Sequence, residues 1–296
     1  MNIVLIVNPF ATGVTQERIA DVERELSRAG RVETLRTERP RHATELVADA
    51  CRRRSDAIVV FSGDGGFNEA LNGLHSDVPI GFLPGGGTSV LPRALGLPHD
   101  PTAAAAQVAD ALAAQRTRRI TLGSVNGRRF AFAAGVGLDA EAVRRVDDMG
   151  RSSDGRRPGD LAFARAVVAA LASNRGHLEP SLEVVGLGRA AFAFVANGSP
   201  YTYAKGIALP IVPDADFELG LDVVAPVRIR RRSLVWTAYA LLRGHPRAAE
   251  VLLGHDLDRV EIVCDTPMPL QADGEDLGDV ERVVFEAQRA AVAVLT

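Results

Sequence analysis

An apolar run, a glycine-rich turn and a helical pattern follow one another without interruption at residues 57–73. The apolar residues, AIVVF at 57–61, have the composition of a strand that is buried on both faces of a parallel sheet. They lead directly into SGDGG at residues 62–66, and a helical pattern begins at Phe67. Glycines at such a turn allow the backbone to approach a ligand closely, and the start of a helix offers free N–H groups to an anion. The segment therefore predicts a phosphate-binding turn in an α/β domain.

Strands and helices alternate through the first 118 residues. The apolar runs predict strands at residues 2–7, 32–37 and 56–61. Apolar residues recur at helical spacing in residues 16–29, 42–53 and 101–114, with Gly30 expected to end the first of these helices. Short links between alternating elements indicate a doubly wound α/β nucleotide-binding domain at residues 1–118.

The pattern changes after residue 118 to short apolar segments separated by Gly, Pro and Asn. This rhythm predicts an antiparallel, β-sandwich-like domain at residues 119–296, whose last strand is a candidate to return to the first domain. Two helical insertions are expected at residues 160–173 and 233–243, and a surface loop at residues 147–159.

Composition and charge exclude several classes of protein. A net charge of −3 and 5% aromatic residues argue against nucleic acid as a partner. Neither Cys51 nor Cys264 has another Cys or a His at metal-ligand spacing, so a zinc site is not expected. The first ten residues lack the features of a signal peptide, and no run of 18 apolar residues is present. These features predict a cytoplasmic protein.

Two further glycine-containing segments occupy the same kind of position as SGDGG. NPFATG at residues 8–13 and PGGGT at residues 84–88 each follow an apolar run. The carboxyl ends of parallel strands meet at one edge of a sheet, where ligands bind, so we expect the three segments to lie together. The P-loop pattern is absent, as is a dinucleotide-binding G-x-G-x-x-G at the first turn. For each segment taken alone, a tight turn without a ligand is the competing interpretation.

Asp64 adds a carboxylate to the second segment. A carboxylate beside phosphate groups is repelled unless a cation lies between them, which makes Mg²⁺ the expected third party. For Asp64 considered alone, the capping of a turn is the alternative role.

Three motifs carry a resemblance to a known family. Residues 62–73 resemble the signature G-G-D-G-T-x-N-E-x-x-N-G, and residues 83–98 resemble L-P-x-G-T-x-N-D-x-A-R-x-L-G-x-P. Residues 271–275, QADGE, match an Asp-Gly-Glu motif near the carboxyl end. Together they resemble the diacylglycerol kinase catalytic family, which includes sphingosine and ceramide kinases and has NAD kinases as distant relatives. With GVGLDA at residues 135–140, the likeness covers essentially the whole chain in order.

The resemblance implies an ATP-dependent lipid kinase with nucleotide bound in a cleft between an α/β domain and a β-sandwich domain. Asp64 would organise Mg²⁺, and Asp273 or Glu275 would accept the proton of the lipid hydroxyl. Without the family, Asp273-Gly274-Glu275 is an ordinary polar turn. The implied nucleotide-binding residues are Asn8, Pro9, Thr12, Thr37, Gly63, Asp64, Gly65, Gly66, Asn68, Glu69, Gly86, Gly87 and Thr88.

The chain departs from the family pattern at several positions. Gly66 replaces a Thr, and Ser89 and Val90 replace an Asn and an Asp. Leu219 stands where the family has an Asp of a structural metal site, so no metal is predicted there. Each lost hydrogen bond to a charged oxygen costs about 1.5–3 kcal/mol. The departures therefore leave open a catalytically weak relative that binds nucleotide or lipid and regulates, and NAD kinase activity is a third alternative.

A basic and apolar segment, RIRRRSLVWTAYALLRGHPR at residues 228–247, has two interpretations. It can lie on an anionic membrane surface, which would place the protein peripherally at the inner membrane, where a lipid alcohol is collected. Alternatively, it is an ordinary helix with Trp236 in the core. The pattern does not identify the lipid, and it is compatible with a homodimer formed through an edge strand of the second domain.

Overall fold

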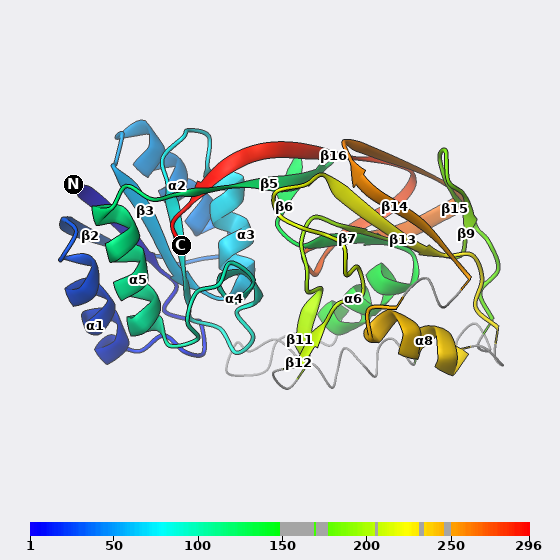
Figure 1. Ribbon diagram of the computed structural model, residues 1–296, viewed down its shortest axis with the longest axis horizontal. Coiled ribbons are helices and arrows are strands. Elements are labelled where there is room, and N and C mark those ends of the chain that lie inside the picture. The colour runs from blue at the N-terminus through cyan, green and yellow to red at the C-terminus, as the bar shows by residue number, and fades with distance from the viewer. Residues whose placement is uncertain (149–168, 170–176, 205–206, 231–233, 246–249) are drawn as a thin grey trace. The chain divides into compact units, whose positions relative to one another are not determined.

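The structure is a computed structural model that describes residues 1–148, 169, 177–204, 207–230, 234–245 and 250–296. Contacts divide the chain into two compact units, residues 1–120 with 290–296 and residues 121–289. The boundaries fall within two strands, β5 (Arg118–Val125) and β16 (Glu275–Val294), both of which are labelled in Figure 1.

The first unit contains a parallel sheet in the order β16-β4-β3-β1-β2. Only the end of β16 takes part, through the pairing of Val294 with Ile80. The remaining strands are β1 (Asn2–Val7), β2 (Arg31–Arg36), β3 (Ala57–Ser62) and β4 (Ile80–Pro84). The helices are α1 (Gln16–Leu26), α2 (His42–Arg52), α3 (Asp64–Gly73), α4 (Val90–Ala94) and α5 (Pro101–Ala113).

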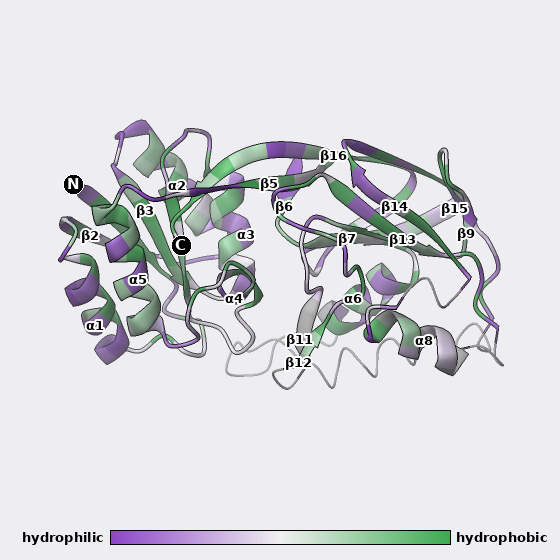
Figure 2. Cartoon of the chain, in the orientation of Figure 1, coloured by the Kyte–Doolittle hydropathy of each residue, from purple (hydrophilic) through white to green (hydrophobic). Residues whose placement is uncertain are grey.

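Helices cover both faces of this sheet. Ile3, Leu5 and Val7 share a core with residues of α1 and α5. Val4 and Ile6 are equally buried but point to the opposite face, where α2 and α3 pack against each other. Burial on both faces explains why β3 is largely hydrophobic (Figure 2) and why β1 is apolar after Asn2. The predicted doubly wound α/β domain is confirmed.

Two predicted helix boundaries in the first unit are wrong. The helix predicted for residues 16–29 ends at Leu26, because the Ser27 hydroxyl donates to the Glu23 carbonyl and residues 28 and 29 form tighter turns. The helix predicted to begin at Phe67 begins at Asp64, since Gly63 is its N-cap and the Phe67 N–H already bonds the Gly63 carbonyl. The glycines of SGDGG are therefore the first turn of a helix.

The second unit is built from antiparallel strands in the order β14-β13-β10-β7-β15-β16. Strands β8 and β9 continue from β15, β6 pairs with β5, and β11 and β12 form a separate hairpin. The strands are β6 (Arg128–Phe130), β7 (Ala133–Val136), β8 (Leu182–Val184), β9 (Gly188–Ala190), β10 (Ala193–Ala196), β11 (Thr202–Ala204), β12 (Ile207–Leu209), β13 (Leu221–Pro226), β14 (Val251–Leu257) and β15 (Arg259–Ala272).

An apolar core that includes Phe130, Val195, Leu270 and Phe285 lies between these strands. The predicted antiparallel β-rich domain is confirmed. Its described helices are α6 (Leu138–Asp148) and α8 (Leu234–Leu242), and α8 lies inside the helix predicted for residues 233–243. The helix predicted at 160–173 and the loop predicted at 147–159 lie almost wholly outside the described residues. In the part of the chain that the structure describes, no helix has the length and hydropathy needed to cross a membrane.

Candidate functional site

The carboxyl ends of four parallel strands are level with one another in the first unit. Val7 lies opposite both Arg36 and Phe61, and Ser62 lies opposite Pro84. The three glycine-containing segments and Thr37 therefore leave the sheet at the same edge. This edge is where ligands bind in open α/β sheets.

Backbone hydrogen bonds hold the three segments against one another. The Gly13 N–H donates to the Gly85 carbonyl (2.8 Å), and the Gly85 N–H donates to the Ser62 carbonyl (2.7 Å). The Asn8 N–H donates to the carbonyl of Phe61, the residue before Ser62 (3.0 Å). The structure thus brings the segments predicted from the sequence into direct contact.

The first turn of α3 provides N–H groups for an anion. The N–H groups of Gly65 and Gly66 belong to this turn, where a helix has no internal acceptors for them and carries partial positive charge. Gly65 and Gly87 are exposed, and a Cβ atom added to either would meet no atom within 4 Å. Protein packing therefore does not require glycine at these two positions, and the space beside them is open to a phosphate group.

Packing does require glycine at positions 85 and 86. A Cβ atom on Gly85 would lie 2.9 Å from the Ser62 carbonyl oxygen, and one on Gly86 would lie 2.9 Å from the Gly63 Cα. The loop after β4 can approach α3 only because these side chains are absent. The glycines thus divide into those that bring the loops together and those that face open space.

Ser62 and Gly66 form a pair that the sequence alone does not reveal. A Cβ atom on Gly66 would lie 2.1 Å from the Ser62 Oγ, which is buried and accepts a hydrogen bond from the Asn8 amide (3.2 Å). The family signature has Gly and Thr at these positions, and this chain has Ser and Gly. A hydroxyl group is therefore present beside residue 66, although the departure at Gly66 predicted its loss.

Exchanging these two residues tests the pairing. We expect Gly66→Thr to lower nucleotide affinity at least tenfold and to destabilise the fold by about 1–3 kcal/mol, because its side chain collides with Ser62. The double variant Ser62→Gly/Gly66→Thr should recover most of both losses. Calorimetric titration with ATP and chemical denaturation measure the two quantities. If Gly66→Thr alone matches the unmodified protein in both, the pairing is wrong.

Asp64 is half-buried at the start of α3, and its Oδ1 accepts the N–H of Leu91 in α4 (3.2 Å). The loop before α4 is closed by the buried Ser89, whose hydroxyl bonds both the N–H and the carbonyl of Gly86 (3.1 Å each). Among the described residues, no three His, Cys, Asp or Glu side chains gather closely enough to hold a metal ion. One carboxylate together with phosphate oxygens and water nevertheless suits Mg²⁺. Asp64 therefore fits Mg²⁺ that arrives with a nucleotide.

The other residues predicted to bind nucleotide differ in burial and in hydrogen-bond partners. Thr37 is buried, and its N–H bonds the Val7 carbonyl at the common edge (2.9 Å). The Glu69 carboxylate instead accepts the N–H of Arg41, which precedes α2 (3.0 Å). Asn68 is buried and accepts hydrogen bonds from the Asn72 amide, so it supports α3 internally. Three further predicted residues lie on the loops at this edge: Pro9 and Thr12 are exposed, and Thr88 is half-buried.

Asp273 and Gly274 form a two-residue turn between β15 and β16. Both have positive φ, 46° and 78°, as an Asp-Gly hairpin turn requires. The Asp273 carboxylate accepts N–H groups from Ala131 (2.7 Å), Phe132 (2.9 Å) and Ala133 (3.3 Å). Its orientation is therefore fixed by backbone donors. Glu275, the first residue of β16, forms an ion pair with Arg128 (2.6 Å).

A buried network behind this turn was not among the predicted site residues. Asp139 is buried, accepts the Tyr201 hydroxyl (2.7 Å) and accepts the Gln271 amide. The Gln271 Oε1 in turn accepts the N–H of Gly274 (2.8 Å). Asp139 thus supports the turn at Asp273 and Gly274 through Gln271, which bonds both Asp139 and Gly274. The available sequence signal was a carboxylate within the matched segment GVGLDA.

Burial raises the pKa of Asp139 to about 6, from an ordinary value of 3.8, although its bonds to Tyr201 and Gln271 oppose the rise. The folded state therefore retains a proton that the unfolded state releases, so stability should fall as pH rises from about 4 to about 6 and then level off. The contribution is about 3 kcal/mol. Asp139→Asn cannot ionise, so its unfolding free energy should fall less over this range than that of the unmodified protein. Urea denaturation at several pH values measures this, with the exposed substitution Glu17→Gln as control, and equal slopes for Asp139→Asn and the unmodified protein would contradict it.

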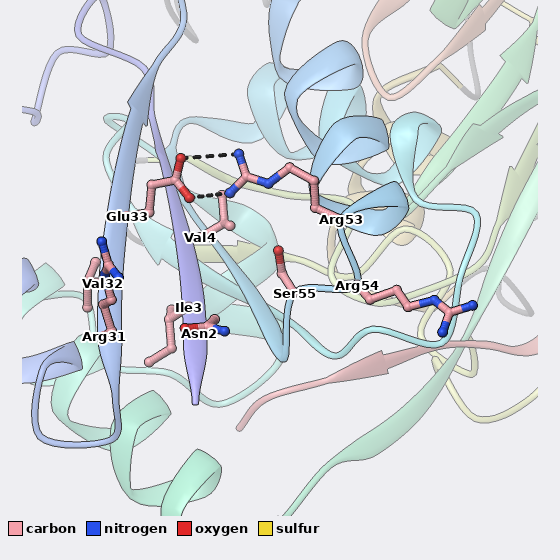
Figure 3. Close-up of a pocket in the computed structure, with 9 residues that line it drawn as sticks. All are labelled: Asn2, Ile3, Val4, Arg31, Val32, Glu33, Arg53, Arg54 and Ser55. Atoms are coloured by element: carbon pink, nitrogen blue, oxygen red, sulfur yellow. Dashed lines mark hydrogen bonds and ion pairs between the residues drawn. The ribbon is translucent and has the colours of Figure 1, made fainter.

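A separate cavity of about 390 Å³ lies at the opposite, amino-terminal edge of the sheet (Figure 3). Its lining includes Asn2, Arg31, Glu33 and Arg53, and an ion pair joins Glu33 to Arg53. The Arg53 guanidinium lowers the pKa of Glu33. None of the predicted site residues lines this cavity. The candidate site is therefore the carboxyl edge of the sheet.

Comparisons with known proteins agree with these features. Residues 2–125 match the family described as the diacylglycerol kinase catalytic domain. Residues 133–296 match the family described as the YegS C-terminal NAD kinase beta sandwich-like domain.

Individual relatives cover different shares of the chain. A diacylglycerol kinase from Bacillus subtilis is 27% identical over 280 residues, 92% of this chain and 88% of that protein. One from Mycobacterium tuberculosis is 31% identical over 191 residues, 60% of this chain and 57% of that protein. A relative from Streptococcus pneumoniae is 30% identical over 151 residues, 48% of this chain. The matched region spans about half the length of that relative, 49%.

Solved structures show the same fold. The crystal structure of a diacylglycerol kinase from Bacillus anthracis has a TM-score of 0.72 and 17% identity, covering 99% of this chain and 96% of that one. An NAD kinase from Archaeoglobus fulgidus in complex with ATP has a TM-score of 0.53 and 15% identity, covering 100% of this chain and 94% of that one. The second family match covers more than half of the chain, so the chain belongs to the family with the YegS C-terminal NAD kinase beta sandwich-like domain, and its residues 2–125 form a diacylglycerol kinase catalytic domain.

Proposed function

We propose that this protein transfers the γ-phosphoryl group of ATP to the hydroxyl of a lipid alcohol such as diacylglycerol. The observation that carries the proposal is the contact of three glycine-containing segments around the first turn of α3, with open space beside Gly65 and Gly87. Relatives named diacylglycerol kinase support the choice of acceptor.

In the proposed reaction, the lipid hydroxyl oxygen forms a bond to the γ-phosphorus while the bond to the bridging β,γ-oxygen breaks. The hydroxyl proton passes to a carboxylate, and ADP leaves. The N–H groups of Gly65, Gly66 and Gly87 bind phosphate oxygens. Mg²⁺, held by Asp64 together with the nucleotide, would neutralise phosphate charge.

Asp273 is the proton acceptor that we propose. Its carboxylate is held in one orientation by three backbone N–H groups, so no side-chain ordering is needed during the reaction. Protein kinases likewise use a positioned aspartate to accept the proton of the substrate hydroxyl. The ion pair of Glu275 with Arg128 favours a supporting role for Glu275.

Transfer of labelled phosphate from ATP tests the proposal. The acceptors are diacylglycerol, a sphingoid base and ceramide in mixed micelles, with NAD⁺ assayed separately. A labelled lipid that requires Mg²⁺ supports the kinase, and the acceptor that reacts fastest identifies the substrate class. Binding of ATP without transfer to any acceptor would instead support the regulatory alternative, and labelled NADP⁺ would support the NAD kinase alternative.

A further inference from the structure

Helix α8 presents three large apolar side chains to solvent. Trp236, Tyr239 and Leu242 are 55%, 51% and 43% exposed, whereas Thr237 and Ala240 on the other face are buried. Each of the three exposed residues follows the previous one by three positions, so they lie along one face of the helix. Helix α8 is labelled in Figure 1. The sequence interpretation that placed Trp236 in the core is therefore wrong.

The exposed face is ordered by its own contacts. The Trp236 and Tyr239 rings are stacked, with centroids 5.9 Å apart and an interplanar angle of 28°. The Arg243 guanidinium lies 5.8 Å from the centre of the Tyr239 ring. Two aromatic rings with polar edges and one cation thus form a continuous surface, which we call the α8 face (Trp236, Tyr239, Leu242 and Arg243).

The segment that contains α8 has a charge opposite to that of the whole chain. Residues 223–249 contain six arginines and no Asp or Glu, while the full chain has a net charge of −3. The arginines are Arg228, Arg230, Arg231, Arg232, Arg243 and Arg247. Among the arginines that the structure describes, Arg228 forms an ion pair with Glu250, just beyond this segment (3.6 Å), whereas Arg243 borders the exposed aromatic rings. A cation beside exposed aromatic residues is complementary to an anionic surface with an apolar interior.

We propose that the α8 face docks on a bilayer that contains anionic lipid. Trp and Tyr favour the boundary between headgroups and hydrocarbon, and arginines are attracted to negatively charged headgroups. A second copy of this chain is a poorer occupant, because a twofold interface would place the basic segment against itself. The inference rests on the proposed function in one respect: a lipid substrate resides in such a bilayer.

Trp236 provides a direct test, because it is the only tryptophan in the chain and its fluorescence reports on α8 alone. The protein is mixed, without ATP, with vesicles of phosphatidylcholine containing phosphatidylglycerol or of phosphatidylcholine alone. We expect a blue shift of the emission with the anionic vesicles, quenching by brominated lipid, and loss of both at high salt. Vesicles of phosphatidylcholine alone should produce a much smaller change.

Substitutions that keep the reporter locate the contact. Tyr239→Ser/Leu242→Ser should weaken partitioning into anionic vesicles at least tenfold, and Arg243→Gln about fivefold. The control is Val185→Ser in the turn between β8 and β9, which removes a side chain that is 50% exposed and should leave partitioning unchanged. Circular dichroism verifies that each variant is folded.

Three results would overturn the inference: no spectral change with anionic vesicles, a change that depends on protein concentration instead of lipid, or equal losses in the α8 variants and the control. The second would assign the face to a second copy of the chain. Because the measurement uses no nucleotide, a vesicle response without phosphate transfer would refute the proposed function alone. Transfer to a short-chain, water-soluble diacylglycerol without a vesicle response would refute this inference alone.

Discussion

Replacing Asp64 by alanine is expected to lower the rate of phosphate transfer about a thousandfold, while the protein remains folded. The carboxylate lies at the first turn of α3, among the N–H groups proposed to bind phosphate. Removing it would leave the charge of the transferring group without its cation, and a single preorganised electrostatic partner contributes on this scale. The measurement is the transfer rate at saturating ATP, together with the affinity for ATP with and without Mg²⁺. Asp64→Ala should abolish the effect of Mg²⁺ on that affinity.

Asp100→Ala is the matched control for Asp64→Ala. Asp100 is the N-cap of α5 in the same unit and accepts the Ala103 N–H (2.9 Å), just as Asp64 accepts the Leu91 N–H. Both substitutions should cost about 1 kcal/mol of stability. Only Asp64→Ala should abolish transfer. Equal, small effects of the two on activity would mean that Asp64 is a capping residue, the alternative that its sequence context leaves open.

The central strands of the first unit could be predicted because they are buried on both faces, unlike the edge strand β2. In a strand such as β3, in which every residue is buried, the residues before the final Ser62 are all apolar, and this run is visible in the sequence. Helix ends were less predictable, since they depend on individual hydrogen bonds. The Ser27 hydroxyl that bonds Glu23 ends α1 early, and the glycines after Ser62 form a helical turn that resembles a loop in sequence.

The candidate site was predictable as a set of loops but not as a set of contacts. The alternation of strands and helices in the sequence indicates a parallel sheet. In such a sheet the segments after β1, β3 and β4 leave from the same edge. The Ser62 hydroxyl leaves no room for a side chain at Gly66, because the end of β3 and the first turn of α3 bring these two residues close together. No pattern of residue types encodes that distance.

Helix α8 illustrates a limit of periodicity. Apolar residues at helical spacing fit a core face and an exposed docking face equally well. Only the exposed fractions of Trp236 and Tyr239 separate the two interpretations. Asp139 is a similar case, because its role follows from bonds to residues distant in sequence, Tyr201 and Gln271.

Asp273→Asn should lower kcat by about 10²- to 10⁴-fold with little change in KM for ATP, the loss expected when a general base is removed. The substitution keeps the size of the side chain and one of its two acceptor oxygens. The new amide group would face the Ala131 N–H, now 2.7 Å from Oδ2, so stability should also fall by about 1–3 kcal/mol. Rates must therefore be measured below the unfolding transition and corrected for the folded fraction.

Gly274→Ala separates a chemical role of Asp273 from a structural one. Gly274 has φ 78°, so an alanine there strains the same turn and should cost roughly 1 kcal/mol while both carboxylates remain. If Asp273 only holds the turn, Asp273→Asn and Gly274→Ala should reduce kcat in proportion to their losses of stability. If Asp273 accepts the proton, Gly274→Ala should retain most of the rate. Glu275→Gln completes the set: a larger loss of kcat than for Asp273→Asn would transfer the role of proton acceptor to Glu275, whose carboxylate would then have to act despite its ion pair with Arg128.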